Sequence, residues 1–143
     1  MEKSLAQIIK AFQAFQTSYI GIAQFATQLP QKNTANNWKY PLMFVALGSS
    51  TIEPGQLRTN MDVYFLDKGD DEDYLKQLSK CQKLFEDFMT YFNKNEETFG
   101  FYFEDSAVAE PVAMAFDDKV IGWKLPIVVQ TKSSENETLV PIR

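Results

Sequence analysis

Met61-Asp62-Val63-Tyr64-Phe65-Leu66 is the stretch of the chain that decides the fold. In an extended strand Met61, Val63 and Phe65 share one face. The other face carries Asp62, Tyr64 and Leu66. Because both faces carry apolar groups, the stretch predicts a central strand. We expect a helix to cover one side of this strand and more protein to cover the other.

A helix is expected directly after this strand, because apolar residues recur at steps of three or four from Tyr74 to Phe92. The acidic run Asp70–Asp73 precedes it, where carboxylates cap a helix and favour its dipole. Counted from Asp67, the run lacks the Gly and Glu spacing of a calcium loop, so a cap is predicted rather than a metal site. The expected apolar stripe consists of Leu75, Leu78, Cys81 or Gln82, Phe85, Phe88 or Met89, and Phe92.

An earlier helix is predicted from the capping-box sequence Ser4-Leu5-Ala6-Gln7, in which Ser and Gln satisfy the first free amides. This amphipathic helix is expected to end before Pro30. Its apolar stripe would consist of Ile8, Phe12, Phe15, Tyr19, Ile22 and Phe25 or Ala26.

Further strands are expected on both sides of the second helix. The apolar run 42–47 suits a strand buried on both faces, and a turn at Pro54-Gly55 would pair it antiparallel with the central strand. Strands are also predicted over 99–103, 107–116 and 120–131, with Pro111 at an edge or bulge and a hairpin turn at Asp117-Asp118-Lys119. The chain is therefore expected to be a single α+β domain over 1–143. It would have a mainly antiparallel sheet and two principal helices, in the order helix, strands, helix, strands.

Composition excludes several kinds of function. The formal charge of -5 and the scattered basic residues disfavour sequence-independent DNA binding. Histidine is absent and Cys81 is the one cysteine, which removes the usual general base and multi-thiol metal sites. We therefore expect no catalytic, metal or cofactor-binding residues and no enzymatic activity. The N-terminal sequence lacks a continuous apolar segment, so a soluble protein without a membrane partner is expected.

The high share of aromatic residues indicates contacts with other chains as an alternative to enzymatic function. Aromatic residues make up 14% of the chain, which is typical of large-area packing in a core or at interfaces. Residues 132–143 place an apolar tip after a polar stretch, and this is either a docking arm or a disordered tail. The candidate oligomer-interface residues are Trp38, Tyr40, Phe99, Phe101, Leu139, Val140 and Ile142.

Three stretches together carry a resemblance to a known class. They are Met61–Asp67 passing into Tyr74–Phe92, Val112–Phe116 followed by the turn and Gly122-Trp123, and the closing Pro141-Ile142. The chain resembles the small ring-forming neck and tail proteins of tailed bacteriophages, of the tail-terminator or connector type. The resemblance is greatest to those of phages of gut Bacteroidota, including the crAss-like group.

The resemblance implies a tail-terminator-like subunit that assembles into a ring of six or twelve copies. Its partners would be other virion proteins such as the portal, the connector or the tail tube, and DNA would pass through the lumen without specific binding. The protein would be made in the host cytoplasm and located in the virion. The alternatives are a small-molecule or peptide-binding module lined by Phe99, Phe101, Tyr102 and Trp123, or a regulatory interaction protein.

Overall fold

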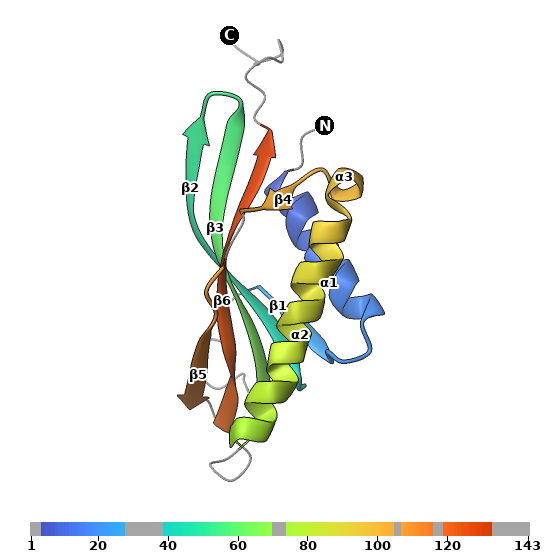
Figure 1. Ribbon diagram of the computed structural model, residues 1–143, viewed down its shortest axis with the longest axis vertical. Coiled ribbons are helices and arrows are strands. Elements are labelled where there is room, and N and C mark those ends of the chain that lie inside the picture. Colours follow the sequence, from blue (N-terminus) through green and yellow to red (C-terminus); the bar gives the residue numbers. More distant parts are fainter. Residues whose placement is uncertain (1–3, 28–38, 70–73, 105–106, 116–118, 133–143) are drawn as a thin grey trace.

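The computed structural model describes residues 4–27, 39–69, 74–104, 107–115 and 119–132. Helices and strands alternate in blocks along these residues, which confirms the α+β class (Figure 1). The elements are α1 Leu5–Ser18, β1 Gln24–Ala26, β2 Leu42–Glu53, β3 Gln56–Lys68, α2 Tyr74–Lys94, α3 Glu96–Phe99, β4 Tyr102–Phe103, β5 Glu110–Ala115 and β6 Lys119–Lys132.

The strands form one curled sheet in which β3 is central, as the two-sided apolar pattern predicted. The strand order is β1-β2-β3-β6-β4, and β5 also pairs with β6. In the part of the chain that is described, β1 and β2 are parallel and the other pairings are antiparallel. Pro111 lies on the edge strand β5, where its missing N–H breaks no ladder, and this confirms its predicted place.

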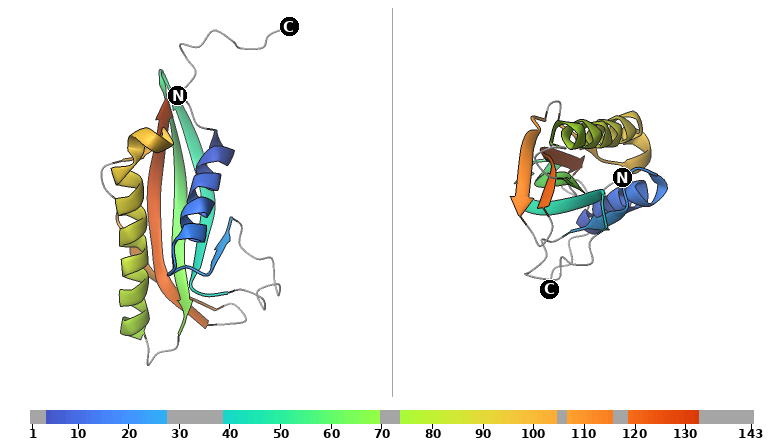
Figure 2. Two further views of the ribbon diagram at one scale, coloured as in Figure 1. Left: turned by 90° about the vertical axis from the view of Figure 1, so that its right-hand side faces the viewer. Right: turned by 90° about the horizontal axis from the view of Figure 1, so that it is seen from below.

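Helices α1 and α2 lie side by side on one face of the sheet (Figure 2). Phe12 of α1 is fully buried, and its ring lies 5.1 Å from that of Phe88 and 5.2 Å from that of Phe92 in edge-on contact. Met61, Val63 and Phe65 of β3 face this helix-side core. Burial of these large side chains is the main stabilising contribution to the fold.

The opposite face of the sheet has a smaller apolar cluster. Leu42, Phe44, Leu66 and Val120 are buried there, and half-buried Tyr64 packs against them. Both faces of β3 are therefore covered along its second half. Nearer its beginning the same face is polar, with half-buried Arg58 and exposed Asn60.

Two predicted boundaries are wrong. The capping box of Ser4 and Gln7 is present, but α1 ends at Ser18 because Tyr19 is extended, with φ -94° and ψ 119°. Ile22 is still buried, but in the connection that leads to β1, and pairing with β2 holds Phe25 in that strand. Local helical periodicity was overridden by sheet pairing.

The predicted strand 99–103 is also shorter than expected. Phe99 ends the short helix α3, and Gly100 follows with φ 76°, a left-handed conformation that stops a helix at low cost. Only Tyr102 and Phe103 pair with β6. In α2 the predicted stripe residues Leu78, Cys81, Phe88 and Phe92 are buried, but Phe85 is only half-buried and the unpredicted Leu84 is buried as well. Leu75 is 75% exposed because it lies in the first turn, before the first buried residue of the helix.

Candidate functional site

The predicted interface residues do not form one surface. Trp38, Leu139, Val140 and Ile142 lie outside the described residues. Tyr40 is half-buried against the smaller cluster, with the Lys68 ammonium 5.7 Å from its ring centroid. The remaining two predicted residues are Phe99 and Phe101.

Phe101 is a core residue, and its prediction as an interface residue has to be corrected. It is 3% exposed and packs against Phe12 and Phe92. Phe99 is half-buried, with its ring centroid 4.9 Å from that of Phe92. Both rings are therefore covered by the chain's own aromatic side chains, Phe12 of α1 and Phe92 of α2 for Phe101 and Phe92 for Phe99.

The apolar pocket predicted around Trp123 is not formed by those residues either. The indole N–H of Trp123 donates to the Leu78 carbonyl at 2.8 Å, and its ring packs edge-on against Phe85. Phe99 and Phe101 instead contact Phe92, about two helical turns further along α2. Tyr102 takes part in a polar network.

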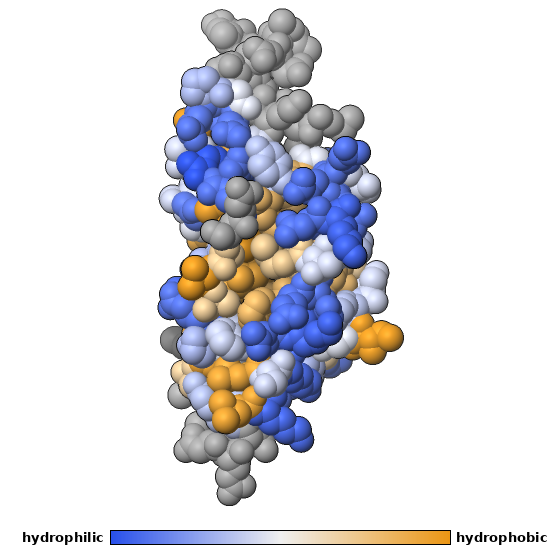
Figure 3. Space-filling view, viewed as in Figure 1, coloured by the Kyte–Doolittle hydropathy of each residue, from blue (hydrophilic) through white to orange (hydrophobic). Residues whose placement is uncertain are grey.

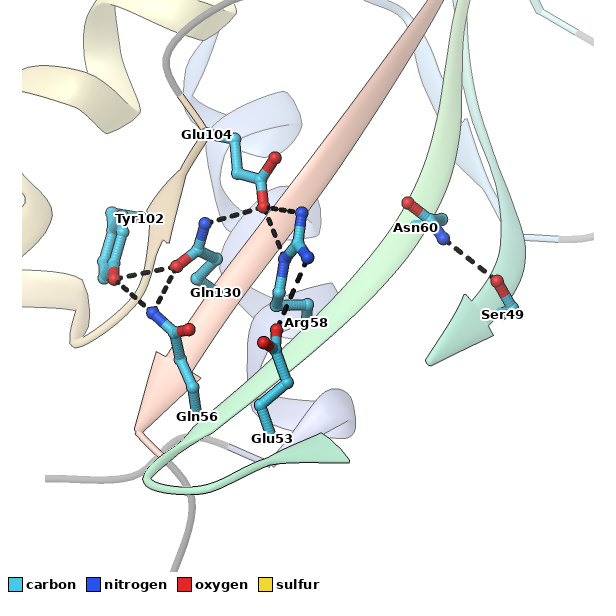
Figure 4. Close-up of polar contacts among 8 residues, drawn as sticks. All are labelled: Ser49, Glu53, Gln56, Arg58, Asn60, Tyr102, Glu104 and Gln130. Atoms are coloured by element: carbon cyan, nitrogen blue, oxygen red, sulfur yellow. Dashed lines mark hydrogen bonds and ion pairs between the residues drawn. The ribbon is translucent and has the colours of Figure 1, made fainter. Parts of the chain in front are cut away.

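This network connects β3, β4 and β6 on the helix-free side of the sheet (Figure 4). Glu104 accepts hydrogen bonds from Arg58 and, at 2.7 Å, from Gln130. The Tyr102 hydroxyl donates to Gln130 at 2.9 Å and accepts from Gln56 at 3.0 Å. The network contains no nucleophile beside a general base. Its hydrogen bonds hold the short strand β4 against the sheet.

The titratable groups in the described chain are arranged as structural contacts. No group of three or more Cys, Asp or Glu that could hold a metal occurs in that part. The largely buried Asp67 accepts from the Lys80 ammonium at 2.7 Å, which ties α2 to the end of β3. The acidic run, residues 70–73, lies outside the described residues, as does the segment 116–118 that includes most of the predicted turn. None of the helices described is long and apolar enough to cross a membrane.

The β2–β3 hairpin leaves two large apolar side chains exposed. Its tip projects beyond the ends of α1 and α2 (Figures 1 and 2). Leu47 pairs with Met61 and Ile52 with Leu57, so all of these side chains belong to the helix-side face. Leu47 is 51% exposed and Ile52 is 80% exposed. We call Leu47, Ile52 and the half-buried Leu57 the hairpin surface.

The backbone of β2 is open along the same hairpin. Strand β1 pairs with it only from Leu42 to Phe44, and among the described strands none lies beside the remainder of that edge. A register shift between Leu47 and Ser50 marks a bulge there. An open edge of this kind accepts a further strand, while a bulge limits uncontrolled pairing.

A groove of about 480 Å³ lies beside this edge, between α1 and β2. Leu5, Ile9 and Leu47 give it a mainly apolar wall, and Thr27 marks its position just after β1. Its full lining is Leu5, Ala6, Ile9, Lys10, Gln13, Thr27 and Leu47. The outer face of α2, in contrast, is mostly hydrophilic (Figure 3).

No protein-family model matches the chain, and no curated protein matches it significantly.

The sequence contained a signal for the full length of β2 that the predictions did not use. Alternating residues continue from Thr51 to Glu53 before the turn at Pro54-Gly55, which is typical of a strand running into a tight hairpin. The predicted strand covered only the apolar run 42–47, whereas β2 continues through a bulge at Gly48-Ser49 as far as Glu53. The exposure of Leu47 and Ile52 depends on where α1 and α2 end, and local sequence does not encode that.

Proposed function

We propose that this chain is a structural subunit of a tailed-phage virion, which assembles into a ring at the head–tail junction or in the tail. The projecting hairpin is the observation that carries this proposal. It combines exposed Leu47 and Ile52 with an unpaired strand edge, and both features favour contact with another protein chain.

A ring needs a contact between two different surfaces of neighbouring subunits, repeated with rotation until it closes. The projecting hairpin is one such surface, since its tip lies at one end of an elongated sheet (Figure 1). In a closed ring it would contact a different surface of the neighbouring subunit, in a head-to-tail arrangement. Six or twelve copies would close the ring, with the portal, the connector or the tail tube as neighbours.

The finer fold proposal is a tail-terminator-like arrangement of the α+β elements. The formal charge of -5 suits a ring whose lumen passes DNA, because a negative wall does not retain phosphate backbones. Such a subunit requires no catalytic or metal site.

The virion role can be tested in the source genome and in purified particles. We expect genes for portal, capsid or tail proteins beside this gene, and antibody labelling at the neck or tail in electron micrographs. Absence of the protein from mature particles, together with an unrelated gene neighbourhood, would rule the proposal out.

A peptide-binding module is the second candidate, because the 480 Å³ groove beside an open strand edge is a suitable site for an extended apolar segment. A strictly monomeric protein that binds apolar peptides with micromolar affinity, and loses this binding when Leu47 is replaced by Glu, would favour that role over ring assembly.

A further inference from the structure

We propose that the groove between α1 and β2 receives the apolar segment Leu139-Val140-Pro141-Ile142 of a second copy of the chain. This inference rests on the proposed ring assembly and names the contact between neighbouring subunits. We call residues 139–142 the arm.

The groove has the chemistry that this arm requires. Leu5, Ile9 and Leu47 line it, and Leu5 remains 42% exposed and Leu47 51% exposed in the single chain. Covering these side chains with apolar groups is favourable at about 25 cal/mol per Å² of apolar surface buried. The volume of 480 Å³ lies within the range of about 300–1,000 Å³ that is usual for ligand sites.

The backbone beside the groove can also hold an extended segment. Strand β1 stops pairing with β2 at Ala26 and Phe44. The groove contains Thr27, the residue after Ala26, and Leu47, three residues beyond Phe44. An arm entering there would pair with the open edge of β2 beyond the end of β1. Main-chain hydrogen bonds would then add to the apolar contact, as in other cases of strand addition.

The residues before the arm complement the charge at the groove. Glu135 and Glu137 precede the arm, and Lys10 belongs to the groove lining. An exposed pair of this kind adds little affinity, but it favours one direction of entry.

Chain length favours a second copy over the same copy. Lys132 pairs with Gln56 at the hairpin tip, whereas Leu47 pairs with Met61 further down the sheet, and β3 separates β6 from β2. Five residue steps along the sheet and two strand spacings across it place the groove about 20 Å from Lys132. The seven steps from Lys132 to Leu139 reach at most about 24 Å. The arm would reach its own groove only with a nearly straight tether, and a neighbour's groove imposes no such limit.

Complementation between two variants tests the contact. The groove variant is Leu47→Glu, and the arm variant combines Leu139→Ser, Val140→Ser and Ile142→Ser in the full chain. By native mass spectrometry we expect the wild-type chain to give a species of several copies and each variant alone to give monomers. Mixed in equal amounts, the two variants should give a dimer with one copy of each, because one intact arm meets one intact groove.

Val108→Ser is the matched control, because Val108 is 73% exposed and lies away from the groove lining. It should form an assembly with the same number of copies as the wild-type chain, and circular dichroism should show that all variants are folded. A mixture that stays monomeric, or single variants that keep the wild-type mass, would overturn the arm contact. If rings form in both variants, ring assembly stands without the arm; if the wild-type chain remains monomeric, both proposals fail.

Discussion

Gly122 of β6 lies against the backbone of Phe65 in β3, and a Cβ atom added to Gly122 would come within 1.9 Å of the Phe65 carbonyl oxygen. The contact joins the two longest strands at the centre of the sheet, where Gly122 pairs with Leu66. Only a residue without a side chain fits between these strands.

Replacing Gly122 with Ala should therefore destabilise the fold strongly. The clash is with backbone, which cannot rotate away, so we expect a loss of at least about 2 kcal/mol in the free energy of unfolding. Urea denaturation followed by circular dichroism measures this loss. Gly69→Ala is the control. A Cβ atom added to Gly69 would lie 2.9 Å from the flexible Gln77 side chain, which can move aside, so a much smaller loss in the free energy of unfolding is expected. Equal effects of the two substitutions would contradict the close-approach argument.

Cys81 should be unreactive in the folded protein. Burial raises the pKa of its thiol to about 12, the negative charge of Asp67 adds to this, and the S–H group faces the Ile121 carbonyl. Thiol reagents attack the thiolate, so labelling at mildly alkaline pH should be slow until denaturant is added. Native labelling as fast as that of a small free thiol would show that Cys81 is not buried between α2 and the sheet.

The contact of Tyr19 with Asp87 should make stability depend on pH at both extremes. The hydrogen bond from Tyr19 holds the pKa of the Asp87 carboxyl below its ordinary value, and Lys83 lies 3.1 Å from the same group. Burial and the Asp87 contact raise the pKa of Tyr19 to about 12. The Asp87 contribution is present above the ordinary pKa of 3.8 and is lost as the pH falls below it.

The Tyr19 contribution has the opposite sign. It is present below the ordinary pKa of 10.0 and is lost as the pH rises toward about 12. Because the contact is partly exposed, a double-mutant cycle of Tyr19→Phe and Asp87→Asn should give a coupling below about 1 kcal/mol at neutral pH. The coupling should be smaller near pH 2. A coupling that does not change with pH would rule out the charge of Asp87 as its source.

Periodicity was sufficient to predict the central parts of this fold. The two-faced pattern of Met61–Leu66 identified the central strand, and the spacing from Leu78 to Phe92 identified the buried stripe of α2. These elements were predictable because their buried faces follow the strand period of two and the helix period of 3.6 directly in the sequence.

The elements that failed depend on pairing partners far away in the sequence. Phe25 fits the stripe of a longer α1, but parallel pairing with Met43 draws it into β1. Phe101 resembles a strand residue with an exposed aromatic face, but contacts with Phe12 of α1 and Phe92 of α2 make it a core residue. The uncovered Leu47 and Ile52 follow from the length of the hairpin relative to the helices, which is a property of the assembled fold.

A native mass spectrum of the purified full-length chain is the most direct test of the central claim, that this subunit assembles through its projecting hairpin. We expect one closed stoichiometry, six or twelve copies, and its loss to monomers when Leu47 and Ile52 are both replaced by Glu. A wild-type chain that remains monomeric across concentrations, or a double variant that keeps the same closed assembly, would contradict it.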